Sequence, residues 1–196
     1  MRPQLWVIAG PNGAGKTTLV SRRVATRIPV INPDDIAADL PRIGGRLDEK
    51  RAGILALQRR TALLKESESL AIETTLTGHS ALRFIAQARQ AGYKITLVFV
   101  GLSSADLSIQ RVEDRVDGGG HSVPVSVLER RYPEALAHLP IAMVDADRTF
   151  VLDNSARRRR LLMSIDNGRM RYLARELPAW FRTSLPQVAG PDPHDQ

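Results

Sequence analysis

The chain has 196 residues, of which 43% are hydrophobic and 25% charged, and it contains no cysteine. This length predicts one domain with a proper core, and the lack of cysteine excludes disulfides and thiolate metal sites. No apolar run approaches the ~20 residues of a membrane helix, and the apolar start at residues 5–9 is too short for a signal peptide. A cytoplasmic location is the default expectation. The net charge of +7 fits nucleic-acid binding, a cleft for several phosphates, or a basic surface without a role.

Strand-like apolar runs alternate with segments of helical spacing, which predicts an α/β fold with a mostly parallel sheet flanked by helices. Strands are expected at residues 4–9, 28–31, 70–73, 94–100 and 148–153. Helices are expected at residues 16–27, 78–91 and from Pro124 onward. The spacing of four further apolar residues predicts one face of a long helix, namely Leu47, Ile54, Leu57 and Leu64.

Between the two last strands of the parallel part, Ser103 or Ser104 is expected to cap a helix. Its buried stripe is expected at Ala105, Ile109, Val112 and Val116. The C-terminal part predicts a β-hairpin at residues 157–173 around Asn167-Gly168, then a short helix at 178–183. The whole predicts a single domain at residues 1–185 with a lid region at about 111–131, followed by a disordered tail at 186–196.

The stretch "IAGPNGAGKTTL" contains G-x-x-x-x-G-K-T, the pattern of a phosphate-binding loop, between an expected strand and an expected helix. Its glycines let backbone N–H groups converge on phosphates, and the helix N-terminus adds partial positive charge. Lys16 is expected to reach the β- and γ-phosphates, and the Thr17 hydroxyl to hold Mg²⁺. The residues expected to bind the nucleotide here are Gly10, Pro11, Asn12, Gly13, Ala14, Gly15, Lys16, Thr17 and Thr18.

Carboxylates follow two expected strands on the side where ligands bind open α/β sheets. Asp34 or Asp35, in "INPDDIA", could accept the proton of an acceptor hydroxyl or support Mg²⁺, or could merely cap a helix beginning at Ile36. Glu73, in "AIETTLTG", could support the metal or bind an acceptor. The hydroxyls that follow it could bind a polar acceptor or cap a helix; they belong to Thr74, Thr75 and Thr77.

Several arginines fall in the expected lid region, where phosphoryl-transfer enzymes place cations. Arg111 and Arg115 share one helix face, and Arg130 and Arg131 follow a glycine stretch that ends at His121. Each arginine alone is more simply a solvated side chain. Further along, Asn154 and Arg157 lie where many such kinases pass a loop over the adenine. The "RRRR" run at 157–160 could also bind nucleic acid, but it enters a strand and few aromatics accompany it.

The ordered set "GPNGAGKTT", "NPDDIA", "ETTLTG", "KITLVFVGL", "RVEDRVDGGGHSVP" and "LDNS" resembles the zeta-toxin family of P-loop kinases, in its compact chromosomal branch. The resemblance implies a nucleotide-kinase-like fold, ATP with Mg²⁺, UDP-N-acetylglucosamine as acceptor, and an antitoxin partner. By matching position it implies Lys16 and Thr17 for ATP and metal, and Asp34 as general base. It implies acceptor binding by Glu73 and Thr75. Its phosphate-binding arginines match Arg115 and Arg130 or Arg131.

Two departures from that family touch acceptor recognition. The long toxins follow the base with a basic residue, where this chain has Ile36, Ala37 and Ala38. They carry a lid arginine where this chain has Gly119-Gly120-His121. The leading hypothesis is a kinase for a hydroxyl of a nucleotide-sugar. The alternatives are a kinase for a nucleoside, a dinucleotide or another sugar, and a P-loop ATPase that acts through a protein or nucleic acid.

Overall fold

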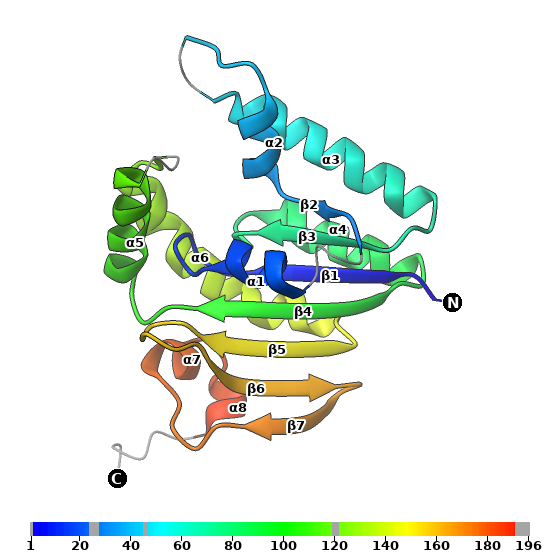
Figure 1. Ribbon diagram of the computed structural model, residues 1–196. Coiled ribbons are helices and arrows are strands. Elements are labelled where there is room, and N and C mark those ends of the chain that lie inside the picture. Colours follow the sequence, from blue (N-terminus) through cyan, green and yellow to red (C-terminus); the bar gives the residue numbers. More distant parts are fainter. Residues whose placement is uncertain (1, 24–27, 45–46, 119–121, 191–196) are drawn as a thin grey trace.

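The computed structural model describes residues 2–23, 28–44, 47–118 and 122–190. A seven-stranded sheet in the order β2-β3-β1-β4-β5-β6-β7 forms its centre (Figure 1). The first five strands of the chain are parallel, and β6 and β7 continue the sheet antiparallel. The strands are β1 (Gln4–Ala9), β2 (Val30–Ile31), β3 (Leu70–Thr74), β4 (Lys94–Gly101), β5 (Arg148–Asp153), β6 (Arg160–Asp166) and β7 (Arg169–Leu173). The predicted α/β fold with its C-terminal hairpin is confirmed.

The helices connect these strands and cover the sheet. They are α1 (Lys16–Arg23), α2 (Pro33–Asp39), α3 (Glu49–Lys65), α4 (His79–Gln90), α5 (Ala105–Asp117), α6 (Val125–Val144), α7 (Ala179–Ser184) and α8 (Pro186–Ala189). Pro186–Ala189 is a helical turn where a disordered tail was expected, because Leu185 is fully buried and accepts the backbone hydrogen bonds that start it. Residues 24–27 of the first expected helix and 191–196 of the tail lie outside the described residues.

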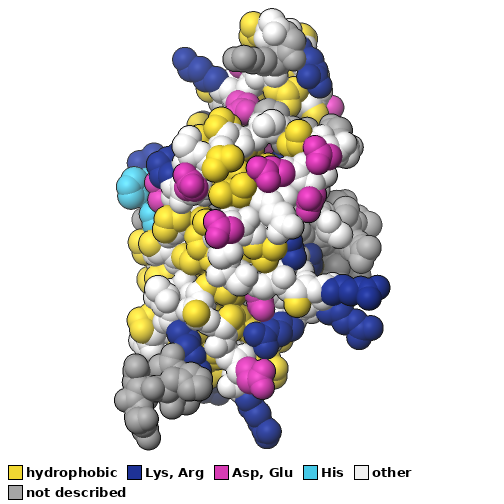
Figure 2. Space-filling view, turned by 90° about the vertical axis from the view of Figure 1, so that its left-hand side faces the viewer, with side chains coloured by type: hydrophobic (Ala, Val, Ile, Leu, Met, Phe, Trp, Pro, Cys, Tyr) yellow, Lys and Arg dark blue, Asp and Glu magenta, His cyan; other side chains and the backbone are white. Residues whose placement is uncertain are grey.

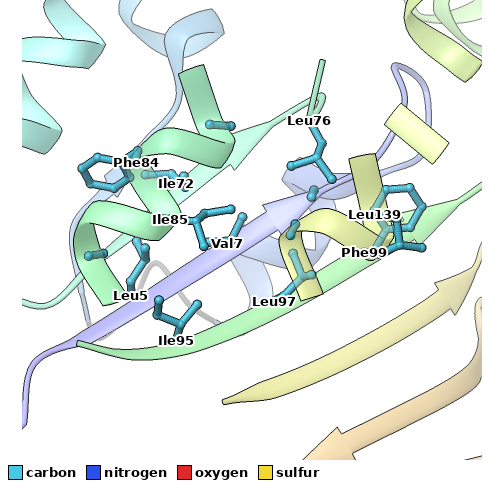
Figure 3. Close-up of a cluster of buried hydrophobic side chains, with 14 of the residues drawn as sticks. Leu5, Val7, Ile72, Leu76, Phe84, Ile85, Ile95, Leu97, Phe99 and Leu139 are labelled. Carbon is cyan, nitrogen blue, oxygen red and sulfur yellow. The ribbon is translucent and has the colours of Figure 1, made fainter. Parts of the chain in front are cut away.

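The main core lies between the sheet and the layer formed by α4, α6 and α7. Alternate strand residues face it, such as Leu5 and Val7 of β1 and Leu97 and Phe99 of β4 (Figure 3). Phe84 of α4 packs there in the same cluster. The opposite face of the sheet carries a smaller cluster around Ile8, Ala71 and Val98, with Leu19 of α1 packed against it.

Two expected helix faces differ from the structure. Ile54 and Leu57 of α3 are 48% and 42% exposed, and Leu47 precedes the helix. The buried positions of α3 are Ala52 and Ala56, which belong to the main core cluster together with Ile36 and Ala37 of the neighbouring α2. In α5, Ser104 is the N-cap as one alternative predicted, and the buried residues are Ser108 and Val112. Ser108 is buried because its hydroxyl donates to the carbonyl of Asn12, 2.7 Å away.

Candidate active site

The phosphate-binding loop joins β1 to α1 at the edge where the parallel strands end. Gly10 has φ +139°, and a Cβ built there would lie 2.1 Å from the carbonyl oxygen of Val100 on β4. Gly13 has φ +71°, and its Cβ would lie 2.9 Å from the carbonyl oxygen of Ser108. Both positions therefore require glycine for two independent reasons, the backbone conformation and the close approach of a neighbouring backbone.

Lys16 is buried inside this loop, where its Nζ donates to the carbonyl oxygen of Pro11 at 2.9 Å. Burial lowers the pKa of Lys16, the carboxylates of Glu73 and Asp34 oppose that shift, and Arg115 and Arg131 add to it. The charges that act on this ammonium group thus come from four different elements, namely α2, β3, α5 and α6. These charged side chains surround the position where the loop pattern predicts that nucleotide phosphates bind.

Glu73, at the end of β3, reaches the loop on the neighbouring strand. Strand register places Ile8 beside Glu73, and the Thr17 hydroxyl donates to Glu73 Oε1 at 2.9 Å. Oε2 is buried and accepts no hydrogen bond from the described residues. Burial raises the pKa of Glu73, whereas Lys16 and the Thr17 hydroxyl lower it. Hard oxygen donors next to a loop threonine fit a divalent cation such as Mg²⁺.

Helix α2 presents one of the two candidate aspartates to the loop. Asn32 is the N-cap, because its side chain accepts a hydrogen bond from the Asp34 N–H at 3.1 Å, and Pro33 occupies the first turn. The alternative that Asp34 or Asp35 caps a helix starting at Ile36 is therefore wrong. Both aspartates are exposed, but Asp34 lines the cavity beside Lys16 and Glu73, whereas Asp35 lies outside the cavity lining.

The cavity has a volume of about 360 Å³. Its walls contain the phosphate-binding loop, the carboxylates of Asp34 and Glu73, and three arginines. Arg111 and Arg115 come from α5 and Arg131 from α6, while Thr75 completes the wall beside Glu73. Figure 2 views this edge of the sheet and shows most of its acidic side chains in the upper half, with lysines and arginines above, beside and below them. The lining residues are Asn12, Gly13, Gly15, Lys16, Thr17, Thr18, Asn32, Pro33, Asp34, Glu73, Thr74, Thr75, Arg111, Arg115 and Arg131.

A second wall supports the loop from the start of the C-terminal hairpin. Asn154 Nδ2 donates to the carbonyl oxygen of Ala14 at 2.9 Å, and an Arg159 terminal nitrogen donates to that of Gly15 at 3.0 Å. Asn154 and Arg157 also line a largely apolar cavity of about 720 Å³ with Thr18, on the α1 face of the sheet. This position next to the loop could receive an adenine base.

Some of the sequence-predicted site residues lie apart from the cavity. Arg130 points to Glu134, with its Nη1 2.8 Å from Oε1, and is not part of the lining. His121 falls outside the described residues, as do the two glycines before it. Sequence reasoning did not assign Asn32 or Arg159. The order Asn-Pro-Asp carries the signal of an N-cap followed by a proline in the first turn, but nothing in the sequence places Arg159 on the loop.

The fold and the loop define a P-loop domain of the kinase-like α/β type. The family model of the AAA domain (AAA_33) matches residues 5–134, and the chain therefore belongs to that family. An uncharacterized protein of Haemophilus influenzae is 29% identical over 139 residues, which span 67% of this chain and 99% of that protein. Within the described residues, no helix combines the length and apolarity that a membrane crossing requires.

Two sets of solved structures share the fold at low sequence identity. The AvrRxo1-ORF1:-ORF2 complex with ATP has a TM-score of 0.70 and 14% identity, and the match covers 86% of this chain and 60% of that one. The PezAT chromosomal toxin-antitoxin system of Streptococcus pneumoniae has a TM-score of 0.54 and 18% identity, with 78% and 68% covered. This chain thus spans less than two thirds of the AvrRxo1 chain.

Proposed function

We propose that the protein is an ATP-dependent kinase that transfers the γ-phosphate to a hydroxyl of a small acceptor, such as the sugar of UDP-N-acetylglucosamine. The observation that carries the proposal is one cavity that holds the phosphate loop, Asp34 and Glu73 together with arginines from α5 and α6. A motor ATPase commonly completes its site with a neighbouring subunit's arginine, whereas this chain supplies three of its own. The solved AvrRxo1 complex with ATP supports ATP as the donor.

The donor half of the reaction relies on the loop. Backbone N–H groups of the loop and the ammonium group of Lys16 bind and orient the ATP phosphates. Lys16 leaves the Pro11 carbonyl to do so. The Thr17 hydroxyl, with Glu73 behind it, would hold Mg²⁺, which neutralises phosphate charge when it is bound.

The acceptor half relies on Asp34. Its carboxylate accepts the proton of the acceptor hydroxyl while that oxygen forms a bond to the γ-phosphorus and the bond to the ADP oxygen breaks. Arg115 and Arg131 stabilise the charge on the transferred group, since both lie in the cavity and both act electrostatically on Lys16. The products are ADP and the phosphorylated acceptor, with the proton on Asp34.

The first prediction concerns Asp34. Asp34→Asn keeps the size of the side chain but cannot accept the proton, so we expect phosphorylation to fall by about 10²-fold or more while ATP affinity changes less than threefold. Mass spectrometry of UDP-N-acetylglucosamine and other nucleotide-sugars incubated with ATP and Mg²⁺ measures the product. Asp35→Asn is the matched control and should retain activity. An unchanged rate in Asp34→Asn would remove Asp34 as the base.

The alternative of a P-loop ATPase is tested in the same reaction. ATP hydrolysis stimulated by DNA or RNA, with no phosphorylated small molecule, would contradict the kinase.

A protein partner that restrains the activity is a further part of the proposal. One structural neighbour is a complex of AvrRxo1-ORF1 with ORF2, and the other belongs to a toxin-antitoxin system. Co-purification with the product of an adjacent small reading frame tests it.

A further inference from the structure

A second cavity of about 240 Å³ adjoins the active site on its acidic side. The two cavities share Pro33, Glu73 and Thr74, so they communicate at the end of β3. The walls of the second cavity are mainly apolar and come from β2, β3, α3 and the start of α4. Two charged side chains line it: Arg60 of α3, and Glu73 at the boundary with the active site.

Arg60 is held in one orientation. Its Nη2 donates to the Ser80 hydroxyl at 2.8 Å and to the Ser80 carbonyl oxygen at 3.2 Å. Its guanidinium lies over the ring of Phe84, with Cζ 4.6 Å from the ring centroid. This fixes a planar cation at the wall of the cavity without using all of its donors.

The charge of Arg60 is not balanced within the part of the chain that the structure describes. No carboxylate of those residues forms an ion pair with it, and its buried Nε meets no hydrogen-bond acceptor there. Burial lowers the pKa of Arg60, and the nearby guanidinium of Arg83 lowers it further. A partly buried cation without a counter-ion is unfavourable, and an anionic ligand would supply the missing charge.

We infer that this cavity binds an anionic group of the acceptor, and that Arg60 selects acceptors with a phosphate or carboxylate beside the hydroxyl that is phosphorylated. The inference rests on the proposed kinase function. It adds to that function a binding site, lined by α3 and the start of α4, for the anionic group of the acceptor. In a nucleotide-sugar the anionic group is the diphosphate next to the sugar. A planar guanidinium suits phosphate and carboxylate because it can donate two parallel hydrogen bonds.

The experiment measures binding by calorimetry with a saturating non-hydrolysable ATP analogue and Mg²⁺, so that the phosphate loop is already filled. Two pairs of ligands are compared: N-acetylglucosamine 1-phosphate with N-acetylglucosamine, and glucuronate with glucose. We expect one or both anionic ligands to bind at least about tenfold tighter than the neutral partner. The pair in which the two affinities differ shows whether the cavity prefers a phosphate or a carboxylate. Equal affinity within both pairs overturns the inference.

Three variants connect the preference to Arg60. Arg60→Met keeps an apolar side chain over Phe84 and should abolish the preference for the anion. Arg59→Met removes the same charge from an exposed position of the same helix and should leave the preference unchanged. Arg60→Lys keeps the charge but lacks the planar fork, and it should lose most of the preference even if Arg60→Met does not fold. Full preference in a folded Arg60 variant means that Arg60 only ties α3 to α4, and overturns the inference.

Product analysis separates this inference from the proposed function. Preferential anion binding through Arg60 without any phosphorylated product contradicts the kinase and supports the binding site. Equal kcat/KM for charged and neutral acceptors, with product formed from both, supports the kinase and contradicts the role of Arg60.

Discussion

Asp147 is a buried carboxylate at the opposite end of the sheet from the active site. Its Oδ2 accepts a hydrogen bond from the Ile95 N–H at 2.7 Å, and Oδ1 one from the Arg89 guanidinium at 2.6 Å. Burial by itself would raise the pKa of Asp147. The backbone hydrogen bond from Ile95 and the charged partner Arg89 outweigh it and lower the pKa below the ordinary value. Asp147 thus links the start of β4 to α4 and the entry of β5.

The prediction at this scale is that Asp147→Asn lowers the free energy of unfolding by about 2 kcal/mol at neutral pH, because charged hydrogen bonds are lost. A group with a lowered folded-state pKa contributes stability above its unfolded pKa and loses it as the pH falls through its folded value. The difference in the free energy of unfolding between wild type and variant should therefore shrink when the pH falls below the ordinary pKa of aspartate. Urea denaturation as a function of pH measures it, with Asp145→Asn as control. A difference independent of pH would contradict the ionic origin.

At the active site, single residues show what the sequence could predict. Lys16, Thr17 and Glu73 were placed together because the carboxyl ends of parallel strands share one edge of a sheet. The residues alone left Asp34 and Asp35 open and only the family resemblance favoured Asp34, since the choice depends on where α2 begins. Asn32 and Pro33 determine that start. Contacts such as Asn154 to the Ala14 carbonyl join residues 140 positions apart, and local pattern carries no signal for them.

At the scale of elements, the phosphate loop depends on its neighbouring strand. We predict that Gly10→Ala destabilises the protein by about 3 kcal/mol, because the new methyl group meets the Val100 carbonyl and alanine is strained at positive φ. Gly53→Ala, within α3 and with no atom within 4 Å of the added Cβ, should instead stabilise by about 0.5–1 kcal/mol. Chemical denaturation measures both. A neutral Gly10→Ala would mean that β4 and the loop separate easily.

The elements themselves were predicted where periodicity and turn chemistry agree. The Asn167-Gly168 hairpin is present, with both residues at positive φ, as the type of turn requires. Helix α3 was located, but its buried face was not, because the apolar spacing pointed to Ile54 and Leu57 while alanines make the contact. The burial of Ala52 and Ala56 in the main core is a tertiary effect that hydrophobic periodicity does not show.

For the molecule as a whole, Asp153 connects the C-terminal segment to the P-loop end of the sheet. Its Oδ1 accepts hydrogen bonds from the Ser155 hydroxyl and from Trp180 Nε1, and Arg160 Nε donates to Oδ2 at 3.2 Å. Trp180 of α7 is 4% exposed and packs directly on Gly101, where a Cβ would lie 2.3 Å from its ring. The hairpin and α7 are therefore part of the same packed unit as β4 and β5.

We predict that Trp180→Ala lowers the free energy of unfolding by about 3–5 kcal/mol and that the protein still unfolds in one transition. Loss of the indole leaves a cavity above Gly101 and removes one of the hydrogen bonds that Asp153 Oδ1 accepts. Urea denaturation followed by circular dichroism measures the effect, and Tyr172→Ala on the exposed strand β7 is the control. An early, separate transition in wild type would show that the hairpin is an independent unit.

The position of β2 at the edge of the sheet has a consequence for how such proteins diversify. Among the described residues β2 pairs with β3 alone, and α2 and α3 follow β2 in the chain, whereas the phosphate loop follows β1 and meets Val100 of β4 and Asn154 after β5. Exchange of residues 30–66 between relatives would replace one flank of the molecule, including Asp34, while keeping the sequence of the phosphate loop. Under the proposed kinase function, chimeric proteins built at this boundary would change the acceptor preference while keeping the phosphate loop.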